Sequence, residues 1–177
     1  MSDFPNLKNP VHLFATIFGI GLLPIAPGTW GSLFALVLFL IFHLLIEINS
    51  FYFFVSVIII SLFSILICWI SVRDQDVKDP GSIVLDEFAG IWLAFFSLVL
   101  SEGLFFEKNS IKFSILSSLF IFFAFRFFDI KKPFPINTID KEIKNGFGVV
   151  LDDLVAGVYT SFLYLFLCFF FYRILMS

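Results

Sequence analysis

The stretch Ile83-Val84-Leu85-Asp86-Glu87-Phe88-Ala89-Gly90 decides how the rest of the chain is interpreted, because it places two adjacent carboxylates at the start of an apolar run. A second copy repeats its β-branched pair, leucine, acid pair and Ala-Gly step with one extra residue: Val149-Val150-Leu151-Asp152-Asp153-Leu154-Val155-Ala156-Gly157. An aromatic residue, Trp92 or Tyr159, stands two residues after each glycine. Acids are scarce in this chain, so the repeated placement predicts a shared role for the two copies.

The composition indicates that lipid forms part of the solvent. The 177 residues are 60% hydrophobic and have a mean hydropathy of +1.04, more apolar than a soluble domain of this length can bury. Only 14% are charged, and the net charge of -3 argues against a nucleic-acid partner. Cys68 and Cys168 lie in apolar runs, and we interpret both as buried hydrophobes. Because only Lys8 precedes the first apolar run, no cleaved signal peptide is expected.

The apolar runs predict an all-α fold, an integral membrane bundle of about five long helices plus a short N-terminal helix. We expect a polar N-terminal tail at residues 1–10 and a single helical membrane domain over residues 11–177. Residues 11–27 are broken by glycine and proline and predict the short helix. A tight turn at 27–32 then leads into the first long helix, with Thr29 or Ser32 as its N-cap. The long helices are expected at 33–46, 51–72, 88–106, 111–128 and 154–172.

The basic residues predict how these helices are oriented. With a cytoplasmic N-terminus, eight of the 11 basic residues fall inside and three outside. The inside residues are Lys8, Arg73, Lys78, Arg126, Lys131, Lys132, Lys141 and Lys144, and the outside residues are Lys108, Lys112 and Arg173. This orientation puts both acid pairs, the turn at 27–32 and the segment 126–148 on the cytoplasmic side.

Two acid pairs at one membrane face predict a metal site. Two unit charges about 4 Å apart repel by about 4 kcal/mol at an effective dielectric of 20, so gathered carboxylates must protonate, separate or bind a cation. Ligation by oxygen alone selects Mg²⁺ first, and Mn²⁺ or Ca²⁺ next. The Ala-Gly steps allow the two helices to approach closely. Successive helical residues point about 100° apart, so one acid of each pair is the expected ligand. The alternative is that the acids bind no metal and only stabilise the helices through a favourable interaction with the positive end of each helix dipole.

A second constellation, Phe125-Arg126-Phe127-Phe128-Asp129-Ile130-Lys131-Lys132-Pro133, points to phosphate. Arg126 and Asp129 share a helix face, and Pro133 ends the helix beside Lys132. A carboxylate that holds a metal and bases that hold phosphoryl oxygens suit a metal-bound phosphate. The alternative is a basic cluster that contacts anionic lipid. The turn at Gly28 and Thr29 presents backbone N–H groups that suit an anion, although a plain helix start explains it equally well.

Several other chemistries lack their residues. The chain has two histidines, His12 and His43, and His43 lies in an apolar run, so a histidine-dependent lipid phosphatase site is not expected. The sequence contains neither a Gly-x-Ser-x-Gly elbow nor an Asp-x-Asp-x-Thr/Val phosphatase loop.

Taken together, four motifs resemble the phosphatidylglycerophosphatase A family. They are Leu23-Pro24-x-x-Pro27-Gly28-Thr29-x-Gly31-Ser32, Asp86-Glu87-x-x-Gly90, Phe125-Arg126-x-x-Asp129-x-x-Lys132-Pro133 and Gly148-x-x-x-Asp152-Asp153-x-x-Ala156-Gly157. The resemblance extends from about residue 11 to 165. It implies a Mg²⁺-dependent phosphatase of the bacterial inner membrane that converts phosphatidylglycerophosphate to phosphatidylglycerol.

The motifs and the resemblance lead to one predicted site on the cytoplasmic side of a multi-pass membrane protein. The predicted metal ligands are Asp86, Glu87, Asp129, Asp152 and Asp153. Catalytic roles are predicted for Asp86, Asp129, Lys132, Asp152 and Asp153, and phosphate binding for Arg126, Lys132, Thr29 and Gly28. Attack by a metal-activated water is the first mechanism considered, and a covalent aspartyl-phosphate is the second. A metal-dependent phospholipid headgroup transferase and a small cation carrier are the alternative functions.

Overall fold

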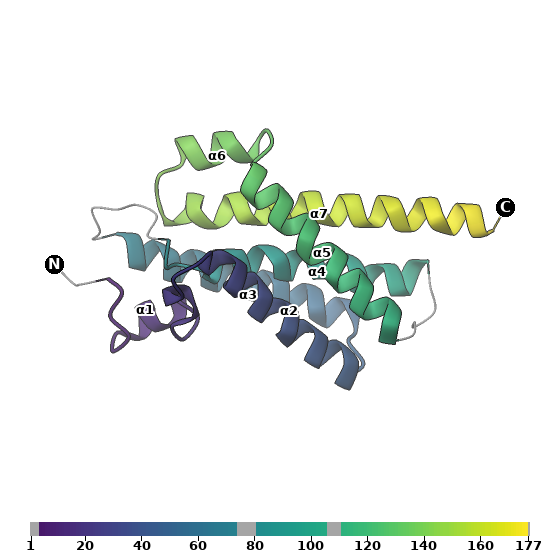
Figure 1. Ribbon diagram of the computed structural model, residues 1–177, viewed down its shortest axis with the longest axis horizontal. Coiled ribbons are helices and arrows are strands. Elements are labelled where there is room, and N and C mark those ends of the chain that lie inside the picture. Colours follow the sequence, from purple (N-terminus) through teal and green to yellow (C-terminus); the bar gives the residue numbers. More distant parts are fainter. Residues whose placement is uncertain (1–3, 74–80, 106–110, 177) are drawn as a thin grey trace.

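The computed structural model describes residues 4–73, 81–105 and 111–176, and all regular structure in these ranges is helical (Figure 1). In chain order the elements are α1 (Pro10–Ala15), η1 (Ile20–Leu22), α2 (Pro27–Leu45), α3 (Ser50–Val72), α4 (Leu85–Leu104), α5 (Ile111–Lys131), α6 (Ile136–Glu142) and α7 (Gly146–Leu175). The predicted all-α fold, with about five long helices and a short N-terminal helix, is confirmed. Helix α6 is an addition that the apolar pattern did not predict, because it is short and polar.

Helix α4 is the centre of the bundle. It contacts each of the other four long helices, and most of its described side chains are buried. Figure 1 shows α7 along the longest axis with α4 beside it, while α6 lies next to the first turns of α7. The starts of α2, α4 and α7 and the end of α5 line one cavity. Helices α2, α4 and α7 therefore run in one direction and α5 runs in the opposite direction, as the sequence predicts.

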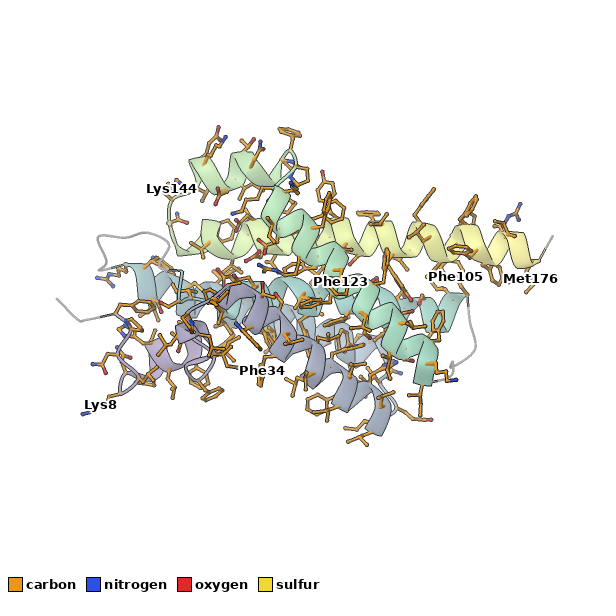
Figure 2. All side chains as sticks on the ribbon, in the orientation of Figure 1. Lys8, Phe34, Phe105, Phe123, Lys144 and Met176 are labelled. Atoms are coloured by element: carbon orange, nitrogen blue, oxygen red, sulfur yellow. The ribbon has the colours of Figure 1, made fainter. Side chains whose placement is uncertain are left out.

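The outer helices have the length and composition of membrane spans. Within the described residues, four helices qualify: α2, α3, α5 and α7 over Gly146–Ile174. Their outward side chains are largely apolar, for example Phe123, which is 67% exposed (Figure 2). Helix α4 corresponds to the span expected at 88–106, whose last residue lies outside the described part of the chain. Lys78 and Lys108, which contributed to the predicted orientation, also lie outside it.

The start of α2 differs from the prediction. The helix begins at Pro27, and its N-cap is Ala26, whose φ of 50° lies in the left-handed region and whose side chain makes no capping bond. Proline suits the first helical position, because that residue's N–H would have no partner within the helix. Thr29 and Ser32 therefore lie inside the helix, and the Ser32 hydroxyl donates to the Gly28 carbonyl at 2.9 Å.

The prediction that two helices begin just after the acid pairs is wrong as well. Helix α4 begins at Leu85, one residue before its acids, and α7 begins at Gly146, well before Asp152. The Asn145 side chain caps α7 by accepting from the N–H groups of Phe147 and Gly148. The apolar pattern marks where lipid-facing residues begin. The helices themselves begin earlier in the chain, in a region where protein shields the acids from lipid.

A cluster of aromatic rings holds α4 against α2 and α3. Phe39 of α2 stacks on Phe95 of α4 with ring centroids 4.3 Å apart, and Phe53 of α3 stacks on Trp92 of α4 at 5.2 Å. The Trp92 indole N–H donates to the Ser56 hydroxyl at 3.1 Å, which satisfies its polar group within the core. The aromatic residue that follows the first acid motif is thus a core anchor.

Helices α4 and α7 approach each other at two glycines. A β-carbon on Gly90 would lie 2.6 Å from the backbone oxygen of Asp153, and one on Gly157 would overlap the carbonyl of Gly90. The expected close approach at the Ala-Gly steps is therefore confirmed. Small residues of this kind are how helices achieve van der Waals packing where lipid weakens the hydrophobic driving force.

We expect Gly157→Ala to destabilise the protein by about 1–3 kcal/mol, because the new methyl group forces α7 away from α4. The direction is informative, since alanine is normally about 1 kcal/mol better than glycine within a helix. Denaturant unfolding in mixed micelles measures the change. Gly81→Ala is the control, because a β-carbon there meets nothing within 4 Å. A Gly157→Ala protein as stable as wild type would contradict the close packing.

Candidate functional site

The predicted motifs converge on a cavity of about 240 Å³ at one end of the bundle. Its described lining is Ala26, Pro27, Gly28, Gly81, Ile83, Asp86, Glu87, Arg126, Asp129, Lys132, Val149, Asp152 and Asp153. These residues come from the first turns of α2, α4 and α7, from the residues just before α2 and α4, and from the last turns of α5 and the residue that follows it. Five carboxylates face two cationic side chains across this small volume, so the ionised cavity has an excess of negative charge.

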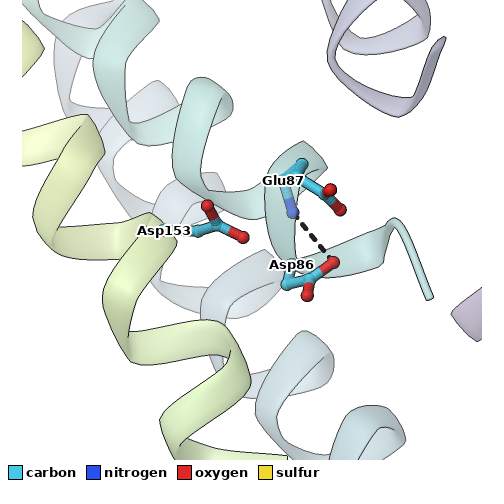
Figure 3. A group of neighbouring side chains, drawn as sticks. All are labelled: Asp86, Glu87 and Asp153. Carbon is cyan, nitrogen blue, oxygen red and sulfur yellow. Dashed lines mark hydrogen bonds between the residues drawn. The ribbon is translucent and has the colours of Figure 1, made fainter. Parts of the chain in front are cut away.

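Three of the carboxylates form a tight group. Asp86, Glu87 and Asp153 each offer an oxygen within 4.8 Å of the others, and Figure 3 shows Asp153 of α7 facing the two acids of α4. The Glu87 backbone N–H donates to Asp86 Oδ1 at 3.0 Å, which fixes the Asp86 carboxylate on the first turn of α4. The contact of Gly90 with the Asp153 backbone, one turn along α4, sets the distance between the two helices. The helix packing thereby brings like charges together.

The group has the properties of a hard-cation site. Glu87 Oε2 is a buried side-chain oxygen without a hydrogen-bond partner. The Glu87 carboxylate also lies beside those of Asp86 and Asp153, so the three like charges repel one another. Unpartnered carboxylate oxygens and mutual repulsion are both relieved by a divalent cation held through oxygen ligands. The residues present therefore fit Mg²⁺ or Mn²⁺, with Asp86, Glu87 and Asp153 as its holders.

Arg126 lines the same cavity. Its Nη1 forms an ion pair with Asp129 and donates to the Ser32 hydroxyl at 3.4 Å, while its Nε is buried without a partner. A β-carbon on Gly28 would overlap the Glu87 carboxylate and lie 3.3 Å from Arg126 Nη1, so this position leaves room for both side chains. The guanidinium is thus held beside the acids with donor capacity to spare.

Lys132 lies between two carboxylates. Its Nζ donates to Asp152 Oδ2 at 2.6 Å and to Asp140 Oδ1 of α6 at 2.8 Å. Burial lowers the pKa of Lys132, but the hydrogen bonds with Asp140 and Asp152 outweigh this effect and raise its pKa above the ordinary value. The lysine is therefore a fixed positive charge at physiological pH.

Most of the predicted site residues line this cavity, and the expectation of one metal ligand from each acid pair stays a prediction. Both Asp86 and Glu87 belong to the three-carboxylate group, since Glu87 at the helix start is long enough to turn back. In the second pair Asp153 belongs to the group, whereas Asp152 pairs with Lys132. Asp129 pairs with Arg126.

Two contacts of the site differ from what the sequence suggested. Among the described lining residues Gly28 is present and Thr29 is not, so the role of Thr29 stays a prediction. Ser32 of the same turn meets Arg126 instead. Asp140 was missed, because an isolated acid between lysines carries no pattern, and only the fold brings α6 over Lys132.

We expect Glu87→Gln to raise stability in metal-free buffer by about 1 kcal/mol, because it removes one of three mutually repelling charges. The same change should reduce the stabilisation of the wild type by added Mn²⁺, since a ligand that binds the folded state stabilises it in proportion to affinity. Thermal unfolding in micelles, with EDTA or with Mn²⁺, measures both effects. A Glu87→Gln protein that is less stable in EDTA but still fully stabilised by Mn²⁺ would contradict the metal site.

Comparison with known proteins gives consistent matches across the site. A family model described as Phosphatidylglycerophosphatase A matches residues 13–168. A Haemophilus influenzae protein named Phosphatidylglycerophosphatase A is 38% identical over 154 residues, which cover 87% of this chain and 86% of the relative. An Escherichia coli K12 protein of the same name is 33% identical over 157 residues, with 88% and 82% covered. A putative phosphatidylinositol-3-phosphatase of Bacteroides thetaiotaomicron is 28% identical over 153 residues, with 85% and 89% covered. No solved structure matches significantly.

Proposed function

The chain belongs to the phosphatidylglycerophosphatase A family, and from this premise we propose that it is a magnesium-dependent enzyme that hydrolyses phosphatidylglycerophosphate to phosphatidylglycerol and phosphate. The observation that carries the magnesium dependence is the group formed by Asp86, Glu87 and Asp153 beside two fixed cations. Bound there, Mg²⁺ supplies positive charge to the phosphoryl oxygens and acidifies a water molecule.

Arg126 and Lys132 bind the phosphate in this proposal. Both line the cavity, and each is held by a carboxylate partner, Asp129 or Asp152. Arginine presents a planar fork of donors to phosphoryl oxygens, and lysine adds a compact charge. The first turn of α2, which begins at Pro27, faces the same cavity at Gly28, where a helix N-terminus favours an anion.

Asp152 accepts the proton of the attacking water. Its Oδ2 is occupied by Lys132, whereas its buried Oδ1 has no partner and lines the reaction cavity. The Lys132 contact holds the carboxylate in one orientation, as a general base requires. The alternative, an aspartyl-phosphate, predicts a phosphorylated carboxylate that acid quenching would trap during turnover.

The surroundings of the cavity suit a lipid substrate. Ile25 precedes the lining residue Ala26, and Phe134 stands two residues after the lining residue Lys132; each is 77% exposed. Exposed apolar side chains at the end of a membrane bundle allow acyl chains to stay in the bilayer while the headgroup reaches the acids. With the basic residues gathered on the same side, we propose a bacterial inner membrane location with the site facing the cytoplasm.

Purified enzyme should release phosphate from phosphatidylglycerophosphate in mixed micelles, and EDTA should abolish this release until Mg²⁺ is restored. Asp86→Asn and Asp153→Asn should each lower kcat/KM by about 100-fold or more, because they remove charge from the cation site. Glu47→Gln, an acid-to-amide change at the opposite end of the bundle, is the matched control and should retain activity.

Phosphatidylinositol 3-phosphate is included as a competing substrate because of the Bacteroides relative. If the enzyme turns over that lipid in preference to phosphatidylglycerophosphate, phosphatidylinositol 3-phosphate becomes the assigned substrate. Full activity of Asp86→Asn or in EDTA would refute the metal-dependent mechanism.

A further inference from the structure

Asp140 is the part of the site that the proposed chemistry leaves unused. It lies on α6, outside the described lining of the cavity, and its Oδ1 accepts from Lys132 Nζ at 2.8 Å. Asp152 already neutralises Lys132 at 2.6 Å and is far more buried, with 7% of its side chain exposed against 36% for Asp140. Charge balance therefore does not require a second carboxylate, and its placement needs a different reason.

The backbone of Lys132 is held in an uncommon conformation. Its φ of 43° lies in the left-handed region, and its N–H donates to the Phe128 carbonyl at 2.8 Å to close the end of α5. Such a conformation is strained for a residue with a β-carbon and persists only where the surroundings enforce it. The backbone end of the lysine is thus fixed, while its long side chain still needs a partner to fix the ammonium.

Helix α6 supplies a firm base for that partner. Ile136 at its start is fully buried and its N–H donates to the Pro133 carbonyl at 2.8 Å. The Tyr159 hydroxyl of α7 donates to the Phe134 carbonyl at 3.0 Å, which ties the preceding turn to α7. The helix also packs directly against α7. Asp140 is therefore presented from a docked element rather than from a loose loop.

We propose that Asp140 is a positioning residue that orients the Lys132 ammonium for the substrate phosphate, an inference that rests on the proposed function. Lysine has three N–H donors. Asp140 and Asp152 take two of them, and together they aim the third into the cavity. Without Asp140 the ammonium keeps only its hydrogen bond with Asp152 and can rotate about it. The phosphate must then fix the orientation of the ammonium when it binds.

Steady-state kinetics in mixed micelles at saturating Mg²⁺ test this role. Asp140→Ala should raise KM about five- to tenfold, the equivalent of one hydrogen bond, with kcat changed less than twofold. Asp140→Asn keeps an oxygen acceptor at the same place and should give a KM between those of wild type and Asp140→Ala. Glu142→Ala, an exposed acid on the same helix, is the matched control and should leave KM unchanged.

A double-mutant cycle separates positioning from a structural effect. On a Lys132→Met background, Asp140→Ala should have no further effect on kcat/KM, because its partner is gone. Effects that multiply would overturn the inference, as would a normal KM for Asp140→Ala, or Asp140→Asn as impaired as Asp140→Ala. Wild-type enzyme that releases no phosphate would instead refute the proposed function, so the two failures are distinguishable.

Discussion

The structure depends on the close contact between α4 and α7 at Gly90 and Gly157, because this contact holds the buried Asp86 and Asp153 and the half-buried Glu87 against one another. In water the repulsion among Asp86, Glu87 and Asp153 would be screened, but within a membrane bundle it is strong enough to separate the helices unless packing or a cation opposes it. The aromatic stack between Phe39 and Phe95 and the Trp92–Ser56 hydrogen bond fix α4 from its other side. Helix packing therefore keeps like charges close together, and in the proposed mechanism a bound cation relieves their repulsion.

The same geometry divides the five acids of the cavity into two sets. Asp86, Glu87 and Asp153 form one group, whereas Asp129 is paired with Arg126 and Asp152 with Lys132. In the proposed mechanism the first set holds an ion and the second orients the two cationic side chains that receive a phosphate. A cation carrier would instead need acids spaced along a path through the bundle. Here they gather at one end next to Arg126 and Lys132, which favours the proposed phosphatase over a carrier.

Much of this arrangement could be predicted from the sequence, because the pattern that carries it is strong. The apolar runs predict the helical bundle, and their alternation puts the two repeated acid motifs at the same end of it. The Ala-Gly steps predict the close approach of α4 and α7. However, the hydrophobicity of the sequence rises at the point where lipid contact begins, which is not the point where a helix begins. The sequence therefore placed both acid pairs outside helices that in fact contain them. Helix α6 and Asp140 escaped prediction for a related reason: a short polar helix has no apolar signal, and its contact with Lys132 exists only in three dimensions.

The central claim is that one divalent cation binds between α4 and α7. Anomalous diffraction from crystals grown with Mn²⁺ tests it most directly, since the metal is located independently of any activity. We predict a single strong peak with oxygens of Asp86, Glu87 and Asp153 at about 2.1 Å, the distance usual for a small divalent ion. A peak bound by Asp129 and Asp152 instead, or no peak among the three carboxylates at saturating Mn²⁺, would contradict the account.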